Sequence, residues 1–304
     1  MRCFVPILLL ALTLTGCGTV RQPDGRLEIA SRQDAELMAY NVGFGAVVGA
    51  VGAAINGDRG TVWERAGRGA LVGAAGGTGL YAGKWMTGQI YADESLAWGW
   101  PALLVHETGA SVVENAALDR PPLSRLSLHA GIVRLDVRPL TREVKARLLP
   151  LNTLAVGLML ADHRLDLART AALGTPIFSG EEGSGGPLGV VDPPRSFALL
   201  NSVYLQESPS DERWYYLVAH EMVHVLQHRE YLRAGTLHAR LDDPLQDSGL
   251  YRSLSEWIYL DNPAAMGVGY VLIEGIPDGY QGCYFDNWYE HEADAFARRE
   301  RVPC

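Results

Sequence analysis

Residues 220–224 read His-Glu-Met-Val-His, a spacing that can hold a metal ion. Side chains four residues apart lie on one face of an α-helix, so His220 and His224 can grip a single Zn²⁺. Glu221 follows the first histidine, where its carboxylate can reach a water at the metal and act as general base. The motif predicts a zinc hydrolase site with one ion per chain; two surface histidines on an ordinary helix are the alternative.

The motif needs a helix, and the flanking residues predict one. Ser208 is a suitable N-cap, Pro209 suits the first helical position, and Asp211 supplies an acid in the first turn. We expect this helix to run to about Arg233, with Gly235 as its stop.

A third ligand is required, and His228 is a poor candidate. On an unbroken helix it lies ~12 Å along the axis from His220, too far to share one ion. No glycine between His224 and His228 would turn the chain.

Residues 289–297 read Tyr-Glu-His-Glu-Ala-Asp-Ala-Phe-Ala and resemble the gluzincin group of zinc peptidases. In that group the third ligand is a glutamate within a Glu-x-x-Ala-Asp pattern, which Glu290, Ala293 and Asp294 match. The resemblance implies that Glu290 binds zinc and that Asp294 orients a ligand histidine. Glu292 remains an alternative ligand, and a solvated acidic helix face remains the plain alternative for both carboxylates.

Two further likenesses extend this comparison. Residues 296–297, Phe-Ala, continue the likeness to the membrane-linked CAAX-protease-like branch, and residues 220–227 are similar to small bacterial peptidases with His-Glu-x-x-His-x-x-Gln. The resemblance covers only these two motifs, and it implies a peptide or protein substrate. A peptidase also needs a donor for the oxyanion, for which Tyr284, Tyr289 and His291 are candidates that the sequence does not rank.

Two other hypotheses stay open. The chain could be a non-catalytic envelope lipoprotein with a structural metal site, or a zinc hydrolase of a non-peptide substrate. Glu221 favours catalysis, because a purely structural site needs no base.

The N-terminus predicts secretion. Residues 4–14 form an apolar run that is too short to span a bilayer, and residues 14–17, Leu-Thr-Gly-Cys, resemble the lipobox of bacterial lipoproteins. We therefore expect a signal peptide at 1–16, lipidation of Cys17, a tether at 17–40 and a location in the cell envelope, at the outer membrane.

The four cysteines fit this address. Cys3 would leave with the signal and Cys17 would carry the lipid. Cys283 and Cys304 remain, and in an oxidising compartment they predict a disulfide.

Residues 41–88 hold 14 of the chain's 34 glycines, within a helical region predicted at 41–120. Its small residues recur every four positions in two apolar halves, 42–55 and 70–86, as in closely packed helix pairs. A glycine-zipper hairpin that enters or lies on the bilayer is one interpretation; a close-packed hairpin of a soluble or membrane-apposed fold is the other.

The formal charge of −9 argues against a nucleic-acid partner, because phosphate binding needs a basic face. The fold class we predict is α+β, with a small sheet packed on zincin-like active-site helices in residues 121–304. In chain order the patterns predict strands at 125–138 with a bulge near Gly131, a helix at 141–149, a strand at 154–160, a loop at 174–196 and a strand at 197–205. The last strand is a candidate edge for pairing with an extended peptide.

Overall fold

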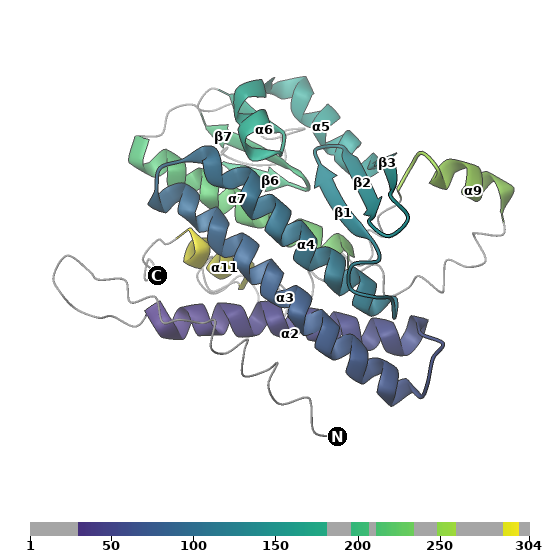
Figure 1. The fold of residues 1–304 in the computed structure, drawn as a ribbon. Helices are drawn as coiled ribbons and strands as arrows, with labels where there is room; N and C mark the ends of the chain where they lie inside the picture. The colour runs from purple at the N-terminus through teal and green to yellow at the C-terminus, as the bar shows by residue number, and fades with distance from the viewer. Residues whose placement is uncertain (1–29, 181–195, 207–210, 234–247, 260–287, 298–304) are drawn as a thin grey trace, which may run out of the picture. The chain divides into compact units, whose positions relative to one another are not determined.

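The computed structural model describes residues 30–180, 196–206, 211–233, 248–259 and 288–297 (Figure 1). Residues 41–304 group into one compact unit. Helices and two small sheets both contribute to this unit, which confirms the predicted α+β class. The lipobox with Cys17, the predicted disulfide partners Cys283 and Cys304, and Tyr284 all lie outside the described residues.

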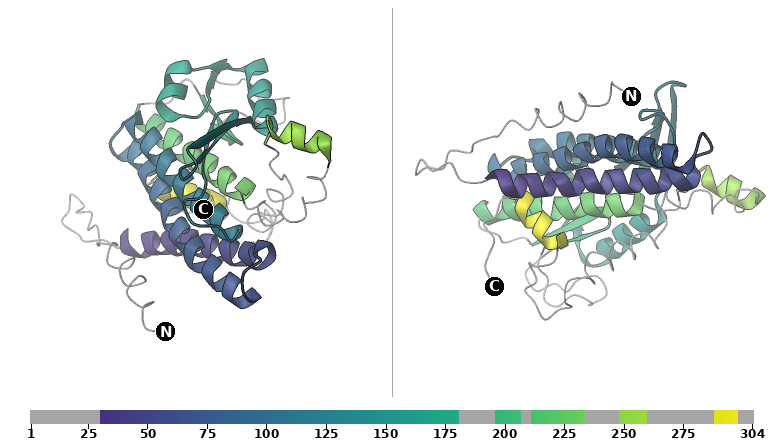
Figure 2. Two further views of the ribbon diagram at one scale, coloured as in Figure 1. Left: turned by 45° about the vertical axis from the view of Figure 1, so that its right-hand side comes forward. Right: turned by 90° about the horizontal axis from the view of Figure 1, so that it is seen from below.

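Helices form the frame around the metal-binding motif. Figures 1 and 2 show α4 beside α3, with α7 packed against both. The helices that matter for the site are α2 (Ala30–Asn56), α3 (Val62–Ala92), α4 (Gly99–Ala117), α7 (Asp211–Arg233) and α11 (Trp288–Phe296). The motif lies on a helix as predicted, and α7 covers all of the described residues 211–233; the predicted N-cap Ser208 and stop Gly235 lie outside the described residues.

The glycines of α2 and α3 lie where these two helices touch. A Cβ added at Gly49 would stand 2.2 Å from the carbonyl oxygen of Gly69, so a side chain there would force the helices apart. The same holds between α3 and α4, where a Cβ at Gly83 would come within 2.4 Å of the His106 Cβ. The helices are longer than the predicted halves, at 27 residues for α2 and 31 for α3.

One described helical segment, Asp34–Asn56, is long and apolar enough to cross a membrane, and a third of its most apolar stretch is buried within the protein.

The first sheet is antiparallel and follows α4. Its strands pair in the order β1 (Leu126–Ala130), β2 (Val133–Arg138) and β3 (Glu143–Leu148). The change of register near Gly131 is a hairpin turn between β1 and β2 rather than a bulge, and Gly131 has the positive φ of 58° that such a turn requires.

Two predictions in the next segment are wrong. The helix expected at 141–149 is strand β3, because Val144, Ala146 and Leu148 alternate in register with β2. The strand expected at 154–160 belongs to helix α5 (Pro150–Asp162), which starts with Pro150 in its first turn. Its buried residues Ala155 and Met159 are four apart, the helical period.

The second sheet packs against α7. Its order is β4 (Arg164–Leu165), β5 (Ile177–Gly180), β7 (Ser202–Gln206) and β6 (Phe197–Leu199). Helix α6 (Leu167–Leu173) lies between β4 and β5 in the chain. Only the β5–β7 pair is parallel among the described strands. Ile177, Val203 and Leu205 from this sheet join Val218 and Met222 of α7 in the main core.

Two expectations for this sheet need correction. The loop predicted at 174–196 contains strand β5, whose Ile177 and Phe178 are fully buried, while residues 181–195 lie outside the described part. The single strand predicted at 197–205 is a hairpin of β6 and β7, and Leu200 turns the chain with a φ of 52°. The remaining described helices are the short 3₁₀ helix η1 (Leu96–Trp98) and α9 (Gly249–Ser255).

Candidate metal centre

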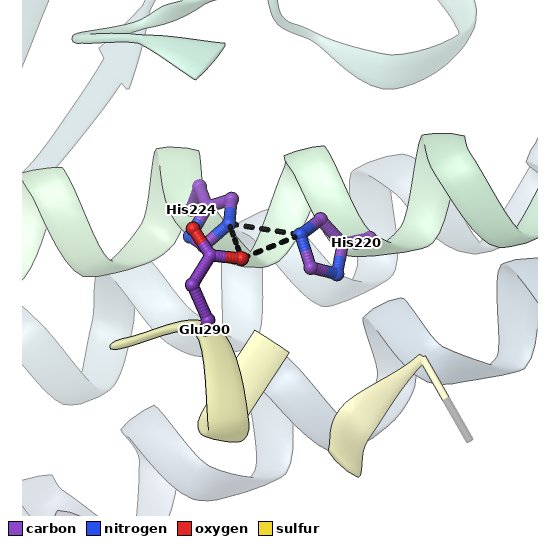
Figure 3. A group of neighbouring side chains, drawn as sticks. All are labelled: His220, His224 and Glu290. Atoms are coloured by element: carbon purple, nitrogen blue, oxygen red, sulfur yellow. Dashed lines mark hydrogen bonds and ion pairs between the residues drawn. The ribbon is translucent and has the colours of Figure 1, made fainter. Parts of the chain in front are cut away.

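Two helices bring three ligand atoms together. His220 and His224 project from one face of α7, and Glu290 projects from the first turn of α11 toward them (Figure 3). Their nearest donor atoms lie within 4.8 Å of one another, and all three residues are buried. The sequence-predicted ligands therefore form a group that could hold a metal ion.

The separations of these atoms are close to, and in two cases slightly shorter than, those between the ligands of a tetrahedral ion. The two Nε2 atoms of His220 and His224 are 3.0 Å apart, and Oε2 of Glu290 lies 3.2 Å from the first and 3.4 Å from the second. Nitrogen and oxygen ligands bound at about 2.0–2.2 Å to a tetrahedral zinc are about 3.3–3.6 Å apart. Two imidazoles and one carboxylate, with one position left open, are also the donor set of catalytic zinc sites.

The second ring nitrogen of His220, Nδ1, contacts an acidic side chain. Its Nδ1 lies 3.0 Å from Oδ1 of Asp294, and the Tyr216 hydroxyl donates to the same carboxylate. Burial opposes a charge on His220, but hydrogen bonds to Asp294 and Glu290 and the charge of Glu221 raise its pKa to about 10. An imidazole that binds a metal ion must give up such a proton.

His224 is oriented by an amide and a ring. Its Nδ1 lies 2.7 Å from Oε1 of Gln227, and the Tyr289 ring stacks on it at a centroid distance of 4.2 Å and an interplanar angle of 13°. These contacts direct Nε2 of His224 toward His220 and Glu290.

Glu221, the predicted general base, lies in a buried environment. Burial raises the pKa of its carboxyl, although the His220 and His224 rings and the Ala198 backbone oppose the shift. A raised pKa makes a carboxylate a stronger base near neutral pH. Ala198 belongs to β6, so the outer strand of the described second sheet lies next to this residue.

The alternative ligands, His228 and Glu292, contact other residues. The His228 ring has Nδ1 3.3 Å from the Leu200 carbonyl and Nε2 3.0 Å from the Tyr289 hydroxyl, and burial lowers its pKa to about 4. Glu292 receives hydrogen bonds from Lys84 and Gln227 rather than facing the histidines.

The structure shows no contact that selects one of the two described oxyanion candidates, Tyr289 and His291. The Tyr289 hydroxyl lies 3.0 Å from Nε2 of His228, and the centroid of the His291 ring lies 5.4 Å from that of the Trp288 ring.

Sequence reasoning missed Tyr216 and Lys84, and it noted Gln227 only as part of a family pattern. Tyr216 precedes His220 by four residues, so helical spacing could have placed it on the ligand face. Lys84 gave no such signal, because its contacts join helices far apart in sequence.

A second buried charge cluster involves α4, where the sequence also has His-Glu at 106–107 but Ala at 110. His106 pairs with Glu230 at 2.8 Å, and Glu107 contacts Arg229 and Arg233. These residues tie α4 to α7 through side-chain ion pairs.

Comparison with protein-family models, curated proteins and solved structures gives no match.

Proposed function

We propose that this chain is a zinc-dependent peptidase of the gluzincin type. The observation that carries the proposal is the convergence of two imidazole nitrogens and one carboxylate oxygen beside a buried glutamate with a raised pKa. His220, His224 and Glu290 would hold Zn²⁺, one ion per chain. When bound, the ion polarises a substrate carbonyl and lowers the pKa of water.

The other residues act on protons and orientation. Glu221 takes a proton from the attacking water on its carboxylate and delivers it to the leaving amine nitrogen. Asp294 accepts from Nδ1 of His220, which leaves Nε2 of that ring as the ligand atom. Strand β6, next to Glu221, is where an extended peptide would add as a further strand.

Hydrolysis is tested with a mixture of defined peptides, read by mass spectrometry, using zinc-loaded protein. We expect new termini with wild-type protein and a loss of about 10²–10⁴-fold in rate with Glu221→Gln, which removes the base but keeps the shape. Glu143→Gln on the exposed surface of β3 is the control and should cleave at the wild-type rate. Equal cleavage by wild type and Glu221→Gln, or none by either, contradicts a peptidase.

We also propose that the protein is a lipoprotein of the bacterial envelope, anchored through Cys17 at the outer membrane. The lipobox-like residues 14–17 and the apolar segment Asp34–Asn56 support this. On α2, Val47, Val51 and Ile55 are exposed at four-residue intervals, which suits a helix hairpin lying against lipid. Mass spectrometry of the membrane-extracted chain should show an acylated Cys17, and Cys17→Ser should release the protein from membranes; an unmodified Cys17 contradicts the anchor.

A further inference from the structure

Lys84 is a buried cation in the C-terminal half of the glycine-rich helix α3. The chain has only two lysines: Lys84 is 0% exposed, whereas Lys145 lies on the exposed face of β3. A buried ammonium is costly unless it is paired and hydrogen-bonded. Its position therefore has to be explained by its partners.

The partners of Lys84 come from α7 and α11. Its Nζ lies 2.9 Å from both carboxylate oxygens of Glu292 and 2.9 Å from Oε2 of Glu230. Asn41 of α2 also accepts from Nζ at 3.0 Å and donates to Glu292 at 2.8 Å. Lys84 thus joins the helix that carries two predicted ligands to the helix that carries the third.

From Glu292 the contacts continue to a ligand. Gln227 Nε2 donates to Oε2 of Glu292 at 2.8 Å and to the Tyr289 carbonyl at 3.0 Å. A carbonyl oxygen can only accept, so the amide nitrogen of Gln227 must face this side. The amide oxygen therefore faces His224, whose Nδ1 lies 2.7 Å away.

The tautomer of His224 follows from this orientation. An amide oxygen only accepts, so Nδ1 of His224 must donate and carry the proton. Its Nε2 is then the ring atom left to bind a metal, and it faces Nε2 of His220 and Oε2 of Glu290.

We propose that Lys84 is a positioning residue for the metal centre, acting through Glu292 and Gln227 to fix the orientation and tautomer of His224. This rests on the proposed function, since it assigns His224 as a ligand. It also gives the glycine-rich helices a role in the site, because the close approach at Gly83 seats the adjacent Lys84 among α4, α7 and α11.

The test is the Zn²⁺ affinity of the full chain, measured by competition with a chelator. Lys84→Met, of similar length without charge, should weaken binding about 10–100-fold, the usual effect of removing an orienting partner. Lys145→Met is the matched control and should bind as wild type. Gln227→Met cuts the same path nearer the ligand and should cause a similar loss.

The double variant decides whether Lys84 acts through Gln227. If it does, Lys84→Met adds little to Gln227→Met, whereas independent effects multiply. Wild-type affinity in Lys84→Met, or a fully multiplied loss in the double variant, overturns the inference. A wild-type chain that binds no Zn²⁺ overturns the proposed function itself, so the two failures are distinct.

A spectroscopic measurement keeps the inference testable if Lys84→Met does not fold. ¹⁵N NMR of the wild-type histidine rings should show the proton of neutral, zinc-bound His224 on Nδ1. A proton on Nε2 contradicts the proposed path of contacts from Lys84 through Glu292 and Gln227 to His224.

Discussion

The dipeptide His-Glu occurs on both α4 and α7, but its surroundings differ. On α4 it forms ion pairs within the protein, whereas on α7 its histidine belongs to a group that could hold a metal ion. His106 and Glu107 on α4 are buried among charged partners from α7, which include Glu230, Arg229 and Arg233. On α7, His220 faces acids on both ring nitrogens, Glu290 at 3.2 Å and Asp294 at 3.0 Å.

The difference lies in what balances the carboxylates. Around Glu107 and Glu114 of α4 the positive charge comes mainly from arginine: Arg134 lies 2.9 Å from Glu114, and Arg125 contacts the same carboxylate. Glu114 is buried, yet these guanidinium groups hold its pKa at about 2. At Glu290 the close partners are two histidine nitrogens, and the three residues form a group that could hold a metal ion. A buried His-Glu pair balanced by arginine is structural, whereas one that converges with a second histidine and an acid suits a cation.

The substitution that should distinguish the metal centre from the α4 cluster most clearly is Glu290→Ala. It removes one of three ligand atoms, so zinc affinity should fall by more than the roughly 100-fold that loss of an orienting residue causes. Chelator competition measures it, with Glu143→Ala on β3 as the exposed control. Unchanged affinity in Glu290→Ala would assign the third ligand to another residue.

The reciprocal change is Glu107→Gln in the α4 cluster. It removes the carboxylate charge that contacts buried Arg229 and Arg233, while the longer contact of Arg233 with Glu114 at 3.9 Å remains, so the free energy of unfolding should fall by about 3–5 kcal/mol. Urea titration of metal-free protein measures this, and Glu143→Gln should cost less than about 1 kcal/mol because its pair with Arg138 is exposed. Zinc affinity of the folded fraction should stay at the wild-type value; a selective loss of zinc would place Glu107 in the metal site.

A smaller effect is expected from Asp294→Asn. The amide keeps the size of the side chain but weakens its hold on Nδ1 of His220, so zinc affinity should fall about 10–100-fold. Tyr216→Phe removes a donor to the same carboxylate and should have the weaker effect of the two. An effect of Asp294→Asn as large as that of Glu290→Ala would make Asp294 a ligand.

The smallest effect is a pH dependence of stability from His129 in the α4 cluster. Burial and the charges of Arg233 and Arg134 lower its pKa from 6.5 to about 4, against the pull of Glu107. Between these values the unfolded chain binds the proton and the folded chain does not, so stability falls as pH drops from 6.5 to 4. In metal-free protein, His129→Gln should lose less stability than wild type over this range, by on the order of 1 kcal/mol. Parallel curves for both proteins would contradict a neutral buried ring.

The α+β class and the motif helix followed from sequence because their signals are local and long. The helix through residues 211–233 and the shared face of His220 and His224 need only helical periodicity. Residues 141–162 were harder, because short apolar segments fit a helix or a strand until their pairing is known. The register of β3 with β2 and the start of α5 at Pro150 resolved them.

The residues of the site also divide into those that a local sequence motif predicts and those that it does not. Glu290 and Asp294 came from a motif, whereas Lys84 and its contact with Glu292 join residues 208 positions apart. No periodicity or spacing reports such a contact, since it exists only once α3, α7 and α11 have packed together.

The most direct test of the central claim is X-ray absorption at the zinc edge of the loaded protein. The account predicts a first shell of nitrogen and oxygen at about 2.0–2.2 Å, with the outer-shell scattering of two imidazoles. Sulfur scattering at about 2.3 Å, or a shell without imidazole, would contradict zinc bound by His220, His224 and Glu290.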